Sequence, residues 1–195
     1  MLTLWFTPGS SSLAVHIALL EIGVPFTPRP VALHRGEQRE PSFRALNPAG
    51  QVPVLVTADG TKITEVLAIL FYLARRFPEA GLLPATDPLT EAAALSWMSF
   101  TASFLHPART QPLERAIRAF EVAEARLGTA DWALGERYSI ADIHLFRLFW
   151  RFRTSREPPA GCLPRLEAHE ARMMARPAVA RAFAAEAAVG YHLPP

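Results

Sequence analysis

The fold of this 195-residue chain is indicated most clearly by one segment, Asn47-Pro48-Ala49-Gly50-Gln51-Val52-Pro53-Val54-Leu55. Asn47-Pro48 and Gly50 are turn formers, and an apolar run that favours a β-strand follows them. Pro53 has no N–H to give to a sheet, so it belongs at the head of a strand or at an edge. Two interpretations are open. Pro53 is an ordinary loop-to-strand proline, or it follows a cis bond at an edge where the N–H and C=O of Val52 could pair with an extended peptide.

Working outward from this stretch, strand and helix patterns alternate through the first 80 residues. We expect strands at 2–6, 26–33, 53–56 and near 62–63, and helices at 12–21 and 65–77. The strand at 26–33 contains two prolines, which places it at an edge of the sheet. The last two strands, joined through Ala58-Asp59-Gly60, form a hairpin. This order predicts an α/β thioredoxin-like domain with one parallel pair and one antiparallel hairpin.

The remainder of the chain is predicted to be all-α. A proline-containing linker at 81–88 separates the domain at 1–80 from a helical domain at 89–195. Within the second domain we expect helices at 89–105, 113–127, 139–153, 163–175 and 178–187. Ser139-Ile140-Ala141-Asp142 has the pattern of a capping box, which favours a structural role for this pair over a catalytic one.

Composition excludes several classes of protein. Lys and Arg exceed Asp and Glu by 20 to 18, and the arginines are dispersed along the chain, so nothing favours a nucleic-acid partner. A single cysteine, Cys162, excludes an intramolecular disulfide framework and a cysteine-based metal cluster, and we expect no metal site. No signal peptide and no apolar run of about 18 residues is found, so we expect no membrane partner and a cytoplasmic location.

Several fragments, taken in order, resemble the cytosolic glutathione transferases, most closely the bacterial beta class. The matching fragments are Phe6-Thr7-Pro8-Gly9-Ser10-Ser11-Ser12-Leu13-Ala14 with His16, Asn47 to Leu55, Glu65 with Ala68-Ile69 and Tyr72-Leu73, His106, Ser139 to Asp142, and Arg172 to Val179. The resemblance covers nearly the whole length. It implies that glutathione is the co-substrate and that its cysteinyl backbone pairs with Val52 beside a cis Pro53, with Gln51 adjoining.

The resemblance also implies how the thiol is activated. A hydroxyl at a helix N-terminus stabilises a thiolate, and Ser11 or Ser12 is the candidate donor. The beta class usually has cysteine where this chain has Ser11, so thiol exchange through a mixed disulfide is not expected. The alternative is that the serines only cap the helix. His106 matches a histidine directed at the sulfur, and the following Pro107 predicts a distortion of the helix there.

A second departure lies at the start of the helix near residue 65. Glu65 matches the acid that receives the γ-glutamyl ammonium, but Val66 replaces the serine that binds the γ-glutamyl carboxylate. Loss of such a hydrogen bond costs roughly 1.5–3 kcal/mol. Backbone N–H groups at the helix N-terminus could take over part of that contact.

The sequence therefore predicts a homodimeric glutathione transferase that conjugates the glutathione thiolate to small hydrophobic electrophiles. The electrophile is expected against Trp97, Phe100 and Phe104, whose spacing also suits a core or a subunit interface. Val66 and Ser11 favour the alternative of a non-catalytic binding or assembly module. A glutathione-dependent isomerase or reductive dehalogenase is a third, weaker hypothesis.

Overall fold

The computed structural model describes residues 1–83 and 87–190, and these residues form two compact units. The first unit contains residues 1–73 and 177–195, of which the structure describes those up to 190, and the second contains residues 74–176. The predicted linker lies partly in the undescribed residues 84–86. The division differs from the predicted boundaries in two respects: the first segment ends at residue 73 instead of 80, and the last helix belongs to the first unit.

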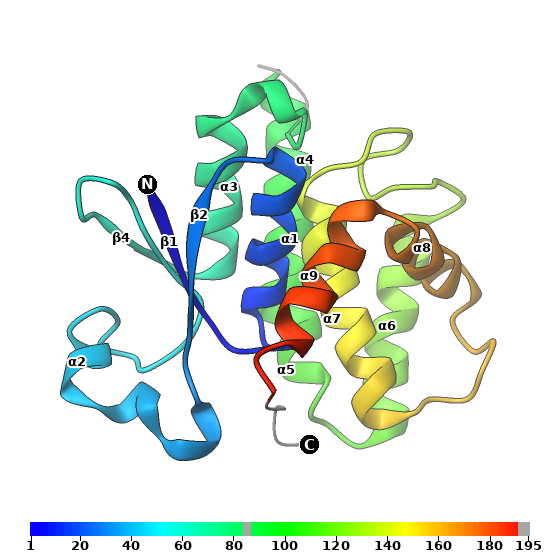
Figure 1. Ribbon diagram of the computed structural model, residues 1–195. Helices are drawn as coiled ribbons and strands as arrows, with labels where there is room; N and C mark the ends of the chain where they lie inside the picture. Colours follow the sequence, from blue (N-terminus) through cyan, green and yellow to red (C-terminus); the bar gives the residue numbers. More distant parts are fainter. Residues whose placement is uncertain (84–86, 191–195) are drawn as a thin grey trace. The chain divides into compact units, whose positions relative to one another are not determined.

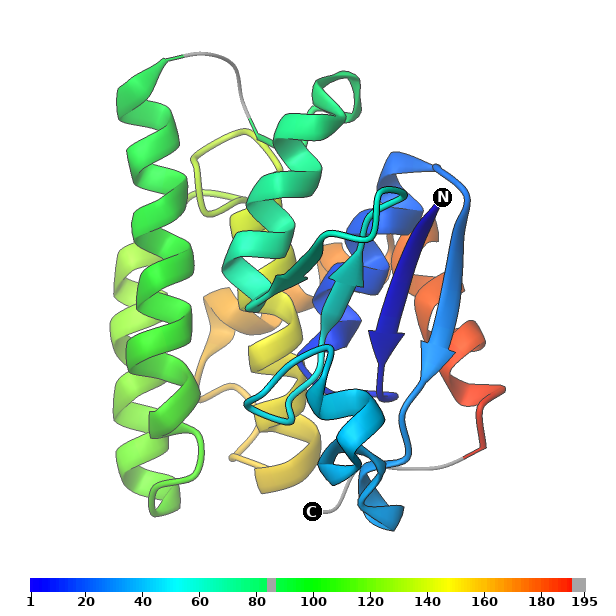
Figure 2. The ribbon, with the colours of Figure 1, turned by 90° about the vertical axis from the view of Figure 1, so that its left-hand side faces the viewer.

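The first unit is built on a four-stranded mixed sheet in the order β2-β1-β3-β4. Its strands are β1 (Leu2–Phe6), β2 (Phe26–Pro30), β3 (Val54–Val56) and β4 (Lys62–Thr64). β1 and β2 are parallel, whereas β3 is antiparallel to both β1 and β4. The parallel pair, the hairpin and the edge position of β2 are confirmed (Figure 2).

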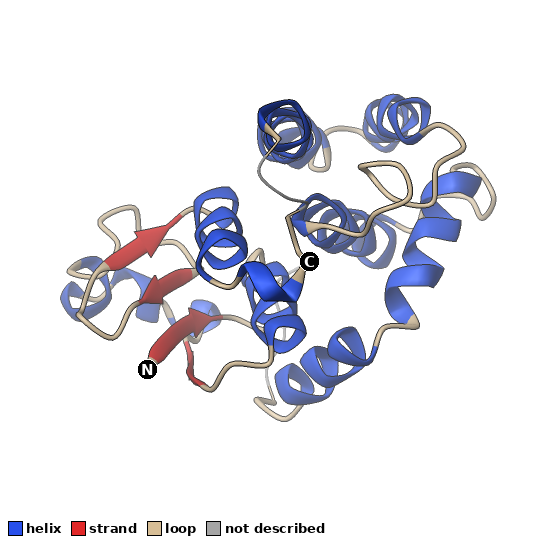
Figure 3. Cartoon of the chain, turned by 90° about the horizontal axis from the view of Figure 1, so that it is seen from above, coloured by secondary structure: helices blue, strands red, loops and turns tan. Residues whose placement is uncertain are grey.

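Helices cover both faces of this sheet. α1 (Ser12–Ile22) and α3 (Val66–Arg76) lie on one face, and the short α2 (Pro41–Arg44) lies on the other (Figure 3). Residues 12–19 of α1 are all buried, which one covering sheet cannot achieve for a helix. The other side of α1 is covered by α9 (Pro177–Ala187), the last helix of the chain (Figure 1). That packing explains why α9 joins the first unit.

In its described part, the second unit contains helices joined by loops and no β-strand longer than an isolated bridge. Its helices are α4 (Pro88–Phe100), α5 (His106–Ala108), α6 (Leu113–Leu127), α7 (Ile140–Arg156) and α8 (Pro164–Met174). α7 is central and packs against α4 and α8. Phe120 of α6 stacks on Phe152 of α7 with 4.3 Å between ring centroids, and both rings are fully buried. Burial of each such ring contributes roughly 1.5–3 kcal/mol.

The helix predicted at 89–105 is not regular at its end. α4 stops at Phe100, and residues Thr101–Leu105 form a π-helical turn before α5. Pro107 at the start of α5 cannot donate a backbone hydrogen bond, so the helical ladder has to change at this point. The prediction of a distortion beside His106 is confirmed, although His106 itself keeps helical dihedral angles of −60° and −50°.

Candidate functional site

The turn before β3 carries the predicted peptide-binding backbone. The Val52–Pro53 bond is cis, as predicted. The β3 ladder begins at Val54, which is opposite Trp5 on one side and Thr64 on the other. Among the described residues, neither the N–H nor the carbonyl oxygen of Val52 has a backbone partner. A donor and an acceptor on one residue are what an added extended peptide requires.

Side-chain hydrogen bonds hold this turn in shape. The Asn47 amide donates to the Gln51 carbonyl oxygen (2.9 Å) and accepts from the Ala49 N–H (3.1 Å). Gly50 has φ +64°, and a β-carbon there would lie 2.9 Å from the carbonyl oxygen of Gln38. Both facts require glycine at this position. The predicted binding residue Gln51 is exposed, so its side chain is available to a ligand.

Gln38 is a candidate that the sequence did not indicate. It lies in a 3-10 turn, Glu37–Arg39, whose backbone closely approaches Gly50. Its side-chain oxygen is buried and has no hydrogen-bond partner among the described residues. A buried amide oxygen without a partner is costly, and a ligand N–H would satisfy it. The sequence could not indicate this role, because Gln38 is a single polar residue in a segment without a regular pattern.

The start of α3 brings Glu65 and Val66 to the surface. Glu65 has φ +66°, a left-handed conformation that costs a non-glycine residue about 1–2 kcal/mol. Its side chain is exposed, while its carbonyl oxygen accepts from the Ile69 N–H (3.0 Å). Val66 is the first residue of α3, so it offers an uncommitted helical N–H but no hydroxyl. Backbone strain of this kind concentrates at ligand sites.

The serines at the start of α1 have separate roles. Ser12 is fully buried, and its hydroxyl donates to the Thr7 carbonyl oxygen (3.0 Å) and accepts from the Thr7 N–H (3.1 Å). Ser10 lies 2.6 Å from the Ser12 hydroxyl and accepts from the Ser12 N–H. Ser11 is half-buried, and its side chain makes no capping hydrogen bond. The Ser12 hydroxyl is therefore already hydrogen-bonded within the turn, and Ser11 is the better candidate donor to a thiolate.

A carboxylate from the far end of the chain fixes the loop that leads to these serines. Glu186 of α9 is buried, and it accepts from the Gly9 N–H (2.6 Å) through one oxygen. Its other oxygen lies 3.0 Å from Nδ1 of His16. His16 therefore links α1 to α9 through this carboxylate. Glu186 was not predicted, because a separation of 170 residues leaves no local signal.

The sheet registers place three of these features at the same end of the sheet. Trp5 near the end of β1 is opposite Val54 at the start of β3, and Val54 is opposite Thr64 at the end of β4. The loops that follow β1, precede β3 and follow β4 therefore emerge together. They carry the serine run, the Val52–Pro53 turn and Glu65, which were predicted to form one binding site.

His106 belongs to the second unit, at the first position of α5. It is half-buried, and burial together with Arg147 and Arg109 lowers its pKa to about 4. The imidazole is consequently neutral at pH 7, where it can donate one hydrogen bond but carries no charge. Any assistance to a thiolate from His106 is therefore hydrogen bonding rather than charge pairing.

The predicted aromatic residues form one continuous stack in the second unit. Trp97 and Phe100 are 6.0 Å apart edge to face, and Phe100 and Phe104 are stacked at 5.1 Å. The guanidinium of Arg126 lies over Trp97 at 4.4 Å. Trp97 is buried but Phe104 is 45 % exposed, so the stack runs from the helical core to the surface.

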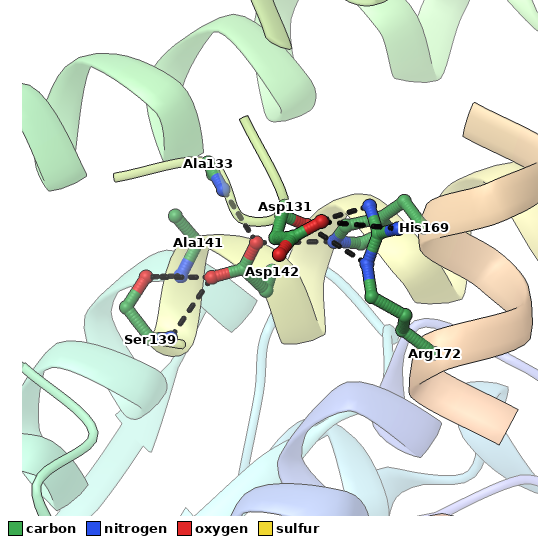
Figure 4. Close-up of polar contacts among 7 residues, drawn as sticks. All are labelled: Asp131, Ala133, Ser139, Ala141, Asp142, His169 and Arg172. Carbon is green, nitrogen blue, oxygen red and sulfur yellow. Dashed lines mark hydrogen bonds and ion pairs between the residues drawn. The ribbon is translucent and has the colours of Figure 1, made fainter. Parts of the chain in front are cut away.

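Ser139 and Asp142 form a capping box, as predicted. The Ser139 hydroxyl accepts from the Ala141 N–H (3.2 Å), and Asp142 accepts from the Ser139 N–H (2.9 Å). Asp142 also accepts from the Ala133 N–H (2.7 Å) and lies 3.0 Å from Nε2 of His169 (Figure 4). Both oxygens of this buried carboxylate take part in contacts that hold the start of α7 in place. The pair is not available for catalysis.

Within the ranges 1–83 and 87–190, no group of three or more His, Cys, Asp or Glu side chains is arranged to hold a metal ion. In the same ranges, no helix combines the length and apolar character that crossing a membrane requires.

A thioredoxin-like sheet with an open Val52 backbone, followed by a helical unit, defines the glutathione transferase class of fold. The sequence matches the glutathione S-transferase N-terminal domain over residues 1–75 and the C-terminal domain over residues 91–177. The chain belongs to the glutathione transferase family.

Individual relatives agree with this assignment. The chain is 32 % identical to glutathione S-transferase GstA of Escherichia coli O157:H7, over 94 % of this chain and 98 % of that protein. It is similar to a glutathione transferase homologue from Sulfitobacter with bound glutathione, at 33 % identity and a TM-score of 0.86, covering 93 % and 96 % of the two chains. It is also similar to the beta-class enzyme of Sphingomonas chungbukensis, at 31 % identity and a TM-score of 0.83, covering 94 % and 98 %.

Proposed function

We propose that this protein conjugates the glutathione thiolate to small hydrophobic electrophiles. The observation that carries the proposal is the convergence of three loops at one end of the sheet, with the unpaired backbone of Val52 among them. Val52 would pair with the cysteinyl backbone, Glu65 would receive the γ-glutamyl ammonium, and Gln51 and Pro53 would line the same turn. The Sulfitobacter homologue binds glutathione, which supports this choice of ligand.

In this proposal Ser11 donates a hydrogen bond to the thiolate, and neutral His106 is an auxiliary donor. The free thiol is only a few per cent ionised near pH 7, so a donor directed at sulfur raises the reactive fraction. The electrophile would lie against the stack of Trp97, Phe100 and Phe104. The second candidate function, a non-catalytic binding module, is favoured by Val66, which provides no hydroxyl for the γ-glutamyl carboxylate.

Calorimetric titration with glutathione tests the proposal directly. We expect millimolar or tighter binding by the parent protein and about 10-fold tighter binding by Val66→Ser, because a hydrogen bond to a charged group is restored. In the same proteins, Ser11→Ala is expected to lower kcat/KM for a chlorodinitrobenzene about 100-fold. Ser12→Ala should lower stability and leave kcat/KM of the folded protein within a few-fold of the parent.

These measurements separate the two candidate functions. A parent protein that shows no heat of binding at millimolar glutathione is not a transferase. Glutathione binding without any Ser11-dependent turnover would support the non-catalytic module.

Glu65 is expected to lower the stability of the fold and to strengthen glutathione binding. Glycine adopts φ +66° without strain, so Glu65→Gly should raise the free energy of unfolding by roughly 0.5–1 kcal/mol. It should also weaken glutathione binding at least about 10-fold, because the ammonium loses its acid. Glu157→Gly is a matched control, because Glu157 of the second unit is the other non-glycine residue with positive φ in the described part of the chain. It should stabilise similarly and leave the glutathione affinity unchanged; equal loss of affinity in both variants would contradict this role of Glu65.

We further propose that two copies of the chain associate, as the family implies. Exposed apolar side chains on the segment from α4 to the π-helical turn support this: Leu89 is 81 % exposed and Phe104 is 45 % exposed. Sedimentation equilibrium that gives the 21.5 kDa mass of one chain would contradict it.

A further inference from the structure

The π-helical turn Thr101–Leu105 interrupts the backbone hydrogen bonding just before His106. The His106 N–H donates to the carbonyl oxygen of Thr101, five residues earlier. The Arg109 N–H donates to the carbonyl oxygen of Leu105, four residues earlier, at 3.0 Å. The helix therefore holds one extra residue before His106 and has regular α-helical spacing again after it. Single π-helical turns of this kind are frequent at functional sites.

Pro107 accounts for the position of this turn. It has no N–H, and in an α-helix its ring would collide with the carbonyl group of Ser103, four residues earlier. Spacing of five residues before the proline avoids that collision. Two hydroxyls act in the same direction: Thr101 donates to the Trp97 carbonyl oxygen (2.9 Å), and Ser103 donates to that of Ser99 (2.8 Å). Hydroxyl groups bonded in this way bend helices.

A continuous α-helix would place His106 on an exposed face. Residues three, four and seven positions apart share a helix face. The residues at these distances before His106 are Ser103, Ala102 and Ser99, and all three are exposed. In a regular helix the imidazole would therefore be directed to solvent.

The extra residue in the π-helical turn moves His106 to another face. One residue corresponds to a rotation of about 100° around the helix axis. His106 then occupies the place of the fourth residue after Thr101, which agrees with its hydrogen bond to the Thr101 carbonyl oxygen. Ala94, Met98 and Thr101 lie on that face, and all three are fully buried. His106 is accordingly half-buried instead of exposed.

We propose that Pro107 is a positioning residue: by fixing the π-helical turn it directs the His106 ring away from the exposed face, where it can act as the auxiliary donor. The inference rests on the proposed function in one respect, the part that His106 takes in conjugation. The direction of the ring is measurable without any turnover. Pro107 itself does not have to contact glutathione or the electrophile.

Proton NMR titration of the histidine rings tests the direction of His106. Burial, followed by Arg147 and Arg109, lowers the pKa of His106 to about 4. Pro107→Ala restores a backbone donor and allows α-helical spacing, which should turn the ring to the exposed face. Its pKa should then rise towards the ordinary value of about 6.5. His106→Gln identifies the signal among those of the six histidines.

The rate of conjugation tests whether this direction matters. Pro107→Ala should lower kcat/KM about 10-fold, as His106→Gln does, because either change removes one hydrogen bond from the thiolate. The affinity for glutathione should stay within about two-fold of the parent, because Val52 and Glu65 belong to the first unit. A general loss of structure would not produce this difference between affinity and rate.

Deletion of Ala102 together with Pro107→Ala is the rescue experiment. Ala102 is exposed, and without it Thr101 lies four residues before His106, so the same hydrogen bond becomes α-helical. The ring should return to the buried face, with a pKa of about 4 and kcat/KM within about two-fold of the parent. Pro112→Ala is the control. Pro112 is also exposed but precedes α6, so its replacement should change neither measurement.

The titration and the kinetics can fail separately. The proposal is overturned if Pro107→Ala leaves the pKa of His106 at about 4, or if Pro112→Ala raises it equally. A raised pKa with unchanged kcat/KM would also overturn it, because the direction of His106 would not matter to the reaction. A parent protein without conjugating activity would refute the proposed function. A raised pKa in Pro107→Ala would then still support the role of Pro107 in directing His106.

Discussion

Asp142→Ala is expected to lower the free energy of unfolding by about 4 kcal/mol or more. The fully buried carboxylate of Asp142 accepts from the backbone N–H groups of Ser139 and Ala133 and contacts the His169 ring. Removing it leaves those groups buried without partners, at about 1–3 kcal/mol each. The capping box would be lost at the same time, and with it the anchor of α7. Equilibrium urea unfolding followed by circular dichroism measures the change.

Asp131→Ala is the matched control, since Asp131 lies near this network but pairs with Arg172 instead of with Asp142 (Figure 4). Its side chain is 70 % exposed and pairs with Arg172 at 3.4 Å, so its loss should cost at most about 1 kcal/mol. Ser139→Ala keeps the carboxylate and should cost about 1 kcal/mol. A cost for Asp142→Ala no greater than that for Asp131→Ala would show that the buried network does not anchor α7.

Glu186→Ala is expected to cost about 3–5 kcal/mol and to disorganise the loop before α1. Glu186 is the buried partner of both the Gly9 N–H and the His16 ring, and loss of one member of such a set leaves the others unpaired. Glu186→Gln retains an acceptor and should lose about half as much. Thermal unfolding reports the stability. The rate of conjugation by the folded fraction reports whether Ser11 is still positioned.

Glu40→Ala serves as the control for Glu186→Ala, because Glu40 is an exposed acid of the same unit. Its replacement should change stability by less than about 0.5 kcal/mol. If the folded fraction of Glu186→Ala keeps the parent's kcat/KM while stability falls, Glu186 supports the fold but does not position the serine loop.

Local signals in the sequence were sufficient for most of the fold. Turn formers at Asn47 and Gly50, the proline at the head of β3 and the serines before α1 fixed where elements begin and end. The alternation of strand and helix patterns then gave the mixed sheet, since short connections leave few topologies. The cis bond at Pro53 and the capping box at Ser139 were also predictable, because each depends on residues within a few positions of one another.

Contacts between distant residues could not be predicted in this way. The place of α9 in the first unit, the Glu186 bridge and the close approach of Gln38 to Gly50 all join segments far apart in the chain. The choice between Ser11 and Ser12 was also open, although the contact that decides it spans only five residues. Both are serines at a helix start, and only the folded turn shows that the hydroxyl of Ser12 faces Thr7.

The order of the elements, the family and the backbone turn at Val52–Pro53 could be predicted from the amino-acid sequence, because each is encoded by residues close together in the chain. Which polar groups already have hydrogen-bond partners, and which do not, is known only from the folded structure. Burial and hydrogen bonding depend on neighbours that packing brings together. The Glu186 bridge is the clearest example: its partners Gly9 and His16 stand 177 and 170 residues away in the chain, and only folding brings the three together.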